Sequence, residues 1–247
     1  MFVPSINFVR QPSGVVFPSI SGLRGHWVAD VGVALSGADV TQWNDQSGNG
    51  YHLTPVGTNP PTFGATAFNS LPGLIFTNAT PRTLGQASGN LGFTGSDTLC
   101  SIFMVLHVPS GQVGRAVSLC GAGAGDYGNL FGALPIFFSG SDDKYTTFKD
   151  GVAFTTNLSV PGNYRLGYWQ NGTSMVQYVN GTGGGTNSTP SSTNFSSGTR
   201  VAIGANAGSF IETGLLATVA ELVIANSAMS GTEISDLDAY FVSKWGL

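Results

Sequence analysis

The densest group of polar residues that could bind a ligand is the loop Asp45-Gln-Ser-Gly-Asn-Gly50. Asp45, Asn49 and the loop carbonyls offer hard oxygen ligands of the kind that Ca²⁺ takes. Calcium usually needs more than one carboxylate, and this loop offers only Asp45. We favour a structural turn, in which Asp45 accepts hydrogen bonds from downstream amides while Gly48 and Gly50 adopt left-handed conformations. We therefore expect no resident metal or cofactor, with Ca²⁺ as the alternative.

Carboxylates are also the groups that glycoside hydrolysis needs, as a pair flanking the scissile bond. The chain has only three glutamates: Glu212, Glu221 and Glu233. Glu233 fits a helix cap, and Glu221 lies in a strand whose neighbouring positions are apolar. Asp142 and Asp143 are adjacent, so on a strand they would point to opposite faces. The sequence therefore predicts no catalytic residues and no enzymatic activity.

Aromatic side chains could supply a sugar-binding surface, because Tyr and Trp combine an apolar ring with one polar group. Tyr51 directly follows the polar loop, and Trp169 lies in a strand-like segment with a second aromatic residue. Together with Asp45 and Asn49, these two residues form our predicted ligand-binding set, with a glycan as the ligand class. Each ring also has a simpler interpretation as core packing, since most aromatic residues of a β-sandwich are buried.

The elements that would position these residues are predicted to be mostly strands. Short apolar runs alternate with turn signals about every eight to twelve residues, as in antiparallel sandwiches. The end of the chain differs, because Ser230-Gly-Thr-Glu233 fits a capping box and apolar residues then recur at helical spacing as far as Trp245. Before this cap, residues 216–225 form an apolar run that predicts a buried strand.

Four segments of the sequence carry a family resemblance. The ending A-E-L-V-I-A-N-S-A-M-S-G-T-E-I-S-D-L-D-A-Y-F-V-S-K-W-G-L (220–247) resembles the closing strand and helix of laminin-G-like, concanavalin A-like jelly-roll domains of bacterial and phage proteins. W-N-D-Q-S-G-N-G-Y-H-L (43–53) is similar to the opening loop of that family. M-V-Q-Y-V-N-G (175–181) and V-A-I-G-A-N (201–206) are similar to its hairpin and late core strand. The resemblance implies an all-β, antiparallel concanavalin A-like β-sandwich with one short C-terminal α-helix. The same fold serves lectins, glycanases and structural modules.

Composition excludes several classes of partner. Charged residues are 9% of the chain, the net charge is −4, and the basic residues are scattered, so nucleic-acid binding is disfavoured. No apolar run reaches the roughly 18 residues of a membrane span. Cys100 and Cys120 lie in separate apolar runs, which favours two buried free thiols over a disulfide or a metal site.

The chain is expected to form one sandwich domain, residues 23–247, preceded by an extended arm, residues 1–22. The arm contains isolated apolar residues and three prolines, Pro4, Pro12 and Pro18, without periodicity. Such an arm would either contact a neighbouring subunit or wrap its own domain as an edge strand.

A weakly charged Gly/Ser/Thr surface, the arm, the lack of a secretory signal and the resemblance together predict a non-enzymatic virion surface protein of a tailed bacteriophage. The hypothesis places the protein in the virion, as a capsid decoration or head-fibre protein or as a tail or receptor-binding protein. It implies contacts with other virion proteins through the arm and a homo-oligomer, trimeric or higher. An extracellular carbohydrate-binding module is the alternative, and a polysaccharide-degrading enzyme is the third.

Overall fold

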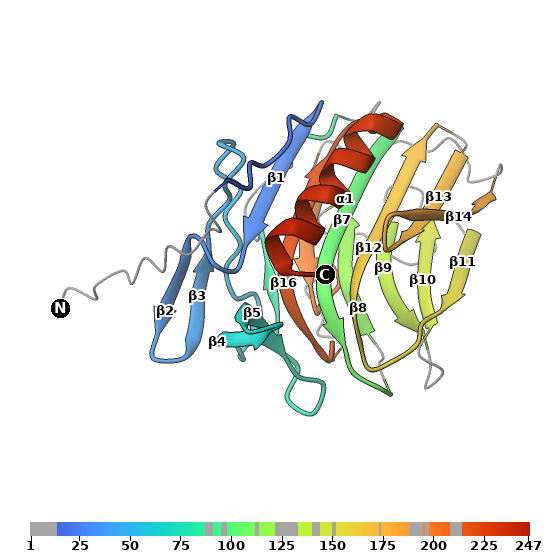
Figure 1. Ribbon diagram of the computed structural model, residues 1–247. Coiled ribbons are helices and arrows are strands. Elements are labelled where there is room, and N and C mark those ends of the chain that lie inside the picture. The colour runs from blue at the N-terminus through green and yellow to red at the C-terminus, as the bar shows by residue number, and fades with distance from the viewer. Residues whose placement is uncertain are drawn as a thin grey trace.

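A computed structural model describes residues 14–86, 91–94, 98–111, 114–121, 133–139, 144–149, 152–172, 174–187, 195, 198–207 and 214–247. Two antiparallel sheets pack together, and one helix, α1 (Gly231–Trp245), lies across the outer face of the larger sheet (Figure 1). The predicted all-β sandwich with one C-terminal helix is confirmed. No helix within the described ranges is long and apolar enough to cross a membrane.

Over the described ranges, the larger sheet has ten strands and the smaller sheet has six. In spatial order the larger sheet contains β14 (Thr182–Asn187), β13 (Ser174–Val179), β12 (Gly162–Asn171), β7 (Leu99–Val108), β16 (Ala217–Ala225), β5 (Leu71–Phe76), β4 (Thr62–Phe68), β3 (Asp39–Trp43) and β2 (Val33–Ser36), and β1 (Leu23–Val28) also pairs with β16. The smaller sheet contains β11 (Val152–Asn157), β10 (Lys144–Lys149), β9 (Ala133–Ser139), β8 (Gly114–Cys120), β15 (Arg200–Ile203) and β6 (Leu84–Gly85).

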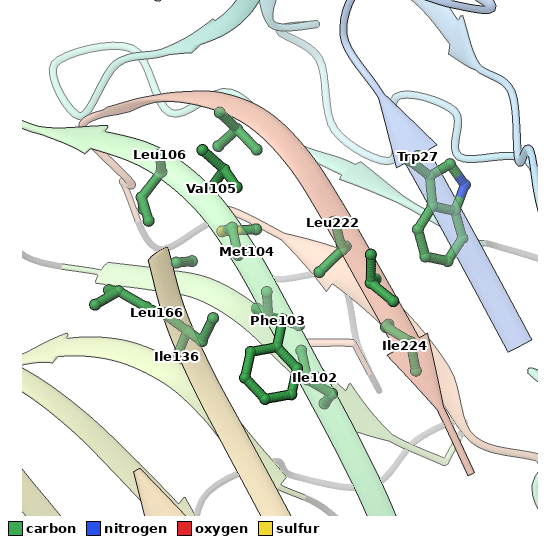
Figure 2. Close-up of a cluster of buried hydrophobic side chains, with 14 of the residues drawn as sticks. Trp27, Ile102, Phe103, Met104, Val105, Leu106, Ile136, Leu166, Leu222 and Ile224 are labelled. Carbon is green, nitrogen blue, oxygen red and sulfur yellow. The ribbon is translucent and has the colours of Figure 1, made fainter. Parts of the chain in front are cut away.

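The core lies between the two sheets (Figure 2). Strand β7 is central in the larger sheet, and its alternate residues Ile102, Met104 and Leu106 are fully buried. They share this core with Leu222 on β16 and Ile136 on β9. The other face of β7 is also buried because α1 covers part of it, which explains a strand that is apolar on both sides.

Both ends of α1 are capped. Ser230 accepts a hydrogen bond from the Glu233 amide and Glu233 accepts one from the Ser230 amide, so the predicted capping box is confirmed. At the other end, Gly246 adopts a left-handed conformation with φ of 64°. The side-chain amide of Asn69, in the turn between β4 and β5, donates to the carbonyls of Trp245 (2.8 Å) and Gly246 (2.9 Å). A tertiary contact therefore satisfies carbonyls that a helix end leaves unpaired.

Residues 14–22 lie against the domain beside α1, and residues 1–13 are outside the described ranges. The Phe17 ring stacks on His26 with 3.9 Å between ring centroids and meets Tyr240 edge-on at 5.2 Å. The Ser21 amide donates to the Glu233 carboxylate at 2.7 Å. We call residues 14–22 the strap, since they connect β1 with the start and the face of α1.

Cys100 and Cys120 are both buried and unbonded to each other, as predicted.

Candidate functional site

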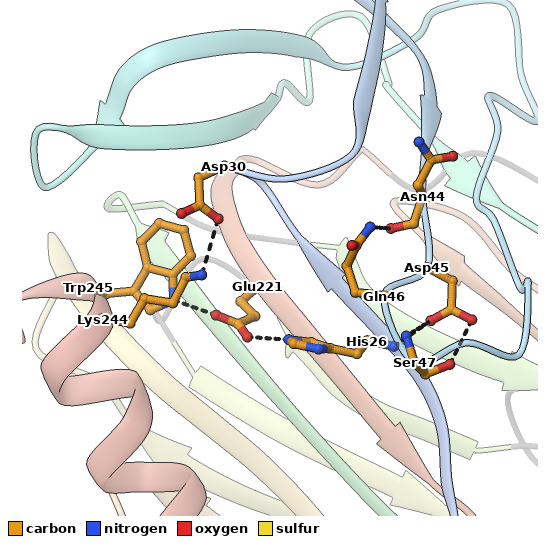
Figure 3. A network of polar contacts seen from close by, with 9 residues as sticks. All are labelled: His26, Asp30, Asn44, Asp45, Gln46, Ser47, Glu221, Lys244 and Trp245. Carbon is orange, nitrogen blue, oxygen red and sulfur yellow. Dashed lines mark hydrogen bonds and ion pairs between the residues drawn. The ribbon is translucent and has the colours of Figure 1, made fainter. Parts of the chain in front are cut away.

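The polar loop forms a closed hydrogen-bonded turn around Asp45. Its carboxylate accepts from the amides of His26 (2.9 Å), Ser47 (2.9 Å) and Tyr51 (3.0 Å) and from the Ser47 hydroxyl (2.7 Å); Figure 3 shows the contacts with His26 and Ser47. Gly48 and Gly50 have φ values of 88° and 76°. These contacts match the predicted turn and engage both carboxylate oxygens. Within the described ranges, no group of three or more His, Cys, Asp or Glu side chains is arranged to hold a metal ion.

Asn49 and Tyr51 lie on the same loop but have separate contacts. The exposed Asn49 amide donates to the carbonyls of Leu23 and Arg24, both at 3.1 Å. Tyr51 is half-buried, and its carbonyl accepts from the Trp27 indole at 2.9 Å. The loop is thus held against β1 by its amide groups, and a ligand role for its residues stays a prediction.

A second polar group is buried between α1 and the larger sheet (Figure 3). Glu221 on β16 lies 2.5 Å from His26 Nε2 on β1 and 2.6 Å from Trp245 Nε1 on α1. Lys244 Nζ lies 3.2 Å from Asp30 Oδ1. The neighbours of Glu221 on its own strand are apolar, and its two polar partners come from other elements. Their separations of 195 and 24 residues explain why no local pattern revealed them.

Burial dominates the chemistry of this polar group. Glu221 is fully buried, and Asp30, His26 and Lys244 are at most 7% exposed. Desolvation raises the pKa of Asp30, although the Lys244 ammonium opposes the shift. Desolvation also raises the pKa of Tyr240, helped by the negative charges of Glu221 and Asp30. Asp30 and Glu221 are therefore near enough to interact, but both carboxyl groups are buried, so a substrate does not reach them in this arrangement. In this arrangement they attach α1 to the sheet.

An accessible surface with binding chemistry lies on the same sheet face, beyond α1. Strand pairing places Gly167 of β12 opposite Phe103 of β7 and Tyr178 of β13. Trp169 follows two residues after Gly167, so its ring lies on the same face. We call Phe103, Trp169 and Tyr178 the aromatic strip.

The strip is built by close packing around Gly167. A Cβ atom there would lie 2.4 Å from the Phe103 ring, so only glycine leaves room for that ring. The rings of Phe103 and Tyr178 are 5.6 Å apart and tilted by 53°. Phe103 is buried and forms the floor, whereas Trp169 and Tyr178 are half-buried and reach the surface.

Each accessible ring of the strip also has a polar group. The Trp169 indole donates to the Met229 carbonyl at 2.9 Å, which fixes the ring beside the start of α1. The Tyr178 phenol is protonated at neutral pH, as any tyrosine with an ordinary pKa is, and burial raises its pKa further, so it can donate a hydrogen bond. Gly183, which pairs with Tyr178, and Gly184 are exposed and carry no side chain that could cover the tyrosine ring. The strip therefore offers apolar ring faces with a polar donor at the edge.

The structure separates the predicted ligand-binding residues into two places. The path from Trp169 to the polar loop crosses from β12 over β7 and β16 to β1, through the paired residues Ser101, Ala225 and Leu23. Asn49 of the loop bonds the carbonyl of Leu23. Three strand spacings, about 14 Å, therefore lie between Trp169 and the polar loop. Sequence reasoning missed Tyr178. The alternation in M-V-Q-Y-V marks its face, but only the pairing of β12 with β13 places it near Trp169.

Comparison with known proteins gives a fold but no family. No protein-family model and no curated protein matches the sequence. Among solved structures, domain 4 of the GH43 extracellular arabinanase AbnA from Geobacillus stearothermophilus, solved with arabinotriose, is similar with a TM-score of 0.61 and 12% identity over 89% of this chain and 100% of that one.

Two other similar structures are larger than this chain. A GH54 α-L-arabinofuranosidase has a TM-score of 0.64 and 13% identity, with 84% of this chain matching 51% of that one. The Trypanosoma rangeli sialidase, solved with the inhibitor DANA, has a TM-score of 0.59 and 14% identity, with 95% of this chain matching 35% of that one. This chain thus spans about half the length of the arabinofuranosidase and about a third of the length of the sialidase.

These likenesses correct two predictions. The expected phage virion protein is wrong, because the similar structures come from glycoside hydrolases and provide no link to a phage particle. The expected absence of enzymatic activity is contradicted by the same finding, since this sandwich occurs within carbohydrate-active enzymes. The β-sandwich that the predicted resemblance implies agrees with these neighbours. At 12–14% identity the likeness itself shows the fold alone.

Proposed function

We propose that this β-sandwich binds carbohydrate through the aromatic strip of Phe103, Trp169 and Tyr178. The observation that carries the proposal is the pair of half-buried rings, Trp169 and Tyr178, on one sheet face. Sugar rings have apolar C–H faces that can pack on aromatic rings, while their hydroxyl groups need polar partners. The Tyr178 phenol is such a partner. The similar domain solved with arabinotriose supports a carbohydrate as the ligand class.

Substitution of the exposed ring tests this proposal. Titration calorimetry against a panel of neutral and acidic oligosaccharides, arabinotriose included, first identifies a ligand of the wild-type protein. Tyr178→Ala should then weaken binding at least tenfold, because it removes the stacking face and the phenol together. Trp169→Ala should act in the same direction. Its indole also bonds Met229, so its thermal unfolding must be measured alongside.

Tyr51→Ala is the matched control, since Tyr51 is another half-buried tyrosine and lies on the polar loop. The proposal expects binding to survive this change. Binding that is lost in Tyr51→Ala and unchanged in Tyr178→Ala would move the site to the polar loop. Absence of binding to every oligosaccharide by a folded wild-type protein would refute the function itself.

Glycoside hydrolysis is a second candidate, favoured by the match of 84% of this chain to an arabinofuranosidase. Among the described residues, Asp30 and Glu221 are carboxyl groups that interact with each other, and both are buried. Release of reducing ends from the same panel would establish this activity. Its loss in both Asp30→Asn and Glu221→Gln, with folding retained, would assign these two residues to the reaction.

A further inference from the structure

We infer that the aromatic strip selects neutral glycans over glycans that carry carboxylates; this inference rests on the proposed function. It concerns the charge of the ligand, which the rings alone do not determine. Recognition of a carboxylate in a protein site normally uses an Arg fork or the positive end of a helix. Both groups lie beside the strip, and both are already occupied by acidic side chains of α1.

Arg165 is the first of these two groups. It lies on β12, two residues before Gly167, and therefore on the face of the strip. Its guanidinium binds Asp238 of α1 through two contacts, Nε to Oδ1 at 2.5 Å and Nη2 to Oδ2 at 3.3 Å. This two-contact geometry is the one that a ligand carboxylate would otherwise take.

Asp238 is also fixed in place by the turn between β13 and β14. Gly181 in this turn has φ of 80°, and a Cβ atom there would lie 2.4 Å from Asp238 Oδ2. Arg165 itself is held by Asn180, whose side-chain oxygen accepts from the Arg165 amide at 3.0 Å. The ion pair is therefore part of a packed contact between the hairpin and α1. Its side chains are only 14% and 25% exposed.

The N-terminus of α1 is the second group. It lies near the strip, because Trp169 bonds the Met229 carbonyl two residues before the helix begins. A free helix start attracts anions through its unpaired amides and its dipole. Here Glu233 supplies the anion, since it accepts from the amides of Ser230 and Ser21, both at 2.7 Å. These hydrogen bonds lower its pKa to about 2, so the carboxylate stays charged.

Arg165 and the start of α1 are thus each neutralised by an acidic residue of the protein. A carboxylated sugar would have to lose hydration at the strip without gaining a charged partner from Arg165 or from the start of α1. A neutral sugar carries no such cost. Selection for neutral ligands therefore follows from the occupied state of Arg165 and of the helix start.

The experiment compares each acidic oligosaccharide with its carboxyl-reduced counterpart, which differs only by the lost charge. Wild-type protein should bind the neutral member at least tenfold more tightly, with an affinity that changes little between 50 and 500 mM salt. Asp238→Asn removes the carboxylate that occupies the Arg165 guanidinium. The ratio of neutral to acidic affinity should fall at least threefold, because the acidic member binds more tightly, and this gain should weaken as salt is added. Asp236→Asn is the matched control, because it removes the same charge from an exposed position of α1 and should leave the preference unchanged.

Equal or tighter wild-type binding of the acidic members would overturn the inference while leaving carbohydrate binding intact. An unchanged preference in Asp238→Asn, with thermal unfolding like that of Asp236→Asn, would overturn the role of the ion pair. Failure of the folded wild-type protein to bind either member of every pair would instead refute the proposed function, and the inference with it.

Discussion

Glu233 joins the strap to the cap of α1 through one carboxylate. It accepts from the Ser230 amide in the cap of α1 and from the Ser21 amide in the strap. Its Ser21 hydrogen bond, followed by the Ser230 hydrogen bond, lowers its pKa from 4.5 to about 2. Because the folded state favours the charged form, this contribution to stability is complete above pH 4.5 and is lost as the pH falls towards 2.

Glu233→Gln tests this pH dependence. At pH 7 the free energy of unfolding of the variant should be about 1 kcal/mol lower than that of wild type, which is the usual size of a cap contribution. The difference should shrink between pH 4.5 and 2.5, since the wild-type carboxylate is losing its charge in the unfolded state and then in the folded state. Urea unfolding at several pH values measures it. A difference that stays constant over this range would contradict the role assigned to the charge.

Glu221 gives a second prediction at the residue scale. Glu221→Ala leaves His26 and the Trp245 indole without their buried acceptor, and should lower the free energy of unfolding by about 3–5 kcal/mol. Trp245→Phe removes a single donor and should cost less. Asp39→Ala, at an exposed carboxylate, is the control and should change stability by less than about 0.5 kcal/mol. Equal urea midpoints for Glu221→Ala and Asp39→Ala would exclude an anchoring role for the buried group.

Among the elements, α1 depends on a turn that is distant in the sequence. Asn69 adopts φ of 46° and its side chain bonds the last carbonyls of the helix. Asn69→Gly keeps the left-handed backbone accessible and should destabilise the protein by about 1 kcal/mol through the lost hydrogen bonds. Asn69→Ala should cost about 1 kcal/mol more, because alanine disfavours positive φ.

Ser70→Gly is the matched control for Asn69. Ser70 also has positive φ, at 64°, in the same turn. Glycine should relieve that conformation, so unfolding should be unchanged or slightly harder. Thermal unfolding of the three variants separates the loss of the cap from the effect of the turn. Equal destabilisation by Asn69→Gly and Ser70→Gly would show that the turn alone matters.

The elements also show how far local patterns reach. Helix α1 and its cap were predicted because Ser230, Glu233 and the apolar stripe are close in the sequence. The turn around Asp45 was predicted for the same reason. Predicting the aromatic strip would have required the pairing of β7, β12 and β13, which local patterns do not give. Predicting the role of Glu221 would have required knowledge of His26, which is 195 residues away. Period-two patterns give the face of a strand, but they leave its neighbours undetermined.

For the whole molecule, the strap closes the layered arrangement of helix and larger sheet. Phe17 lies between His26 and Tyr240, and His26 in turn contacts the buried Glu221. Phe17→Ala should lower the free energy of unfolding by about 1–3 kcal/mol, less than for a fully buried ring, because Phe17 is half-buried. The change should also speed hydrogen exchange in the last turns of α1, since water gains access to the polar group beneath them.

Val16→Ala provides the comparison for Phe17, because Val16 is its neighbour in the strap and is 82% exposed. Stability should change by less than about 0.5 kcal/mol, and exchange in α1 should stay as in wild type. If both variants unfold at the same urea concentration, the strap contributes nothing through Phe17. If only Phe17→Ala loses protection in α1, the strap, the helix and the sheet stabilise one another as one cooperative unit. The contacts explain why: the strap packs on His26, α1 bonds Glu221, and these two sheet residues bond each other.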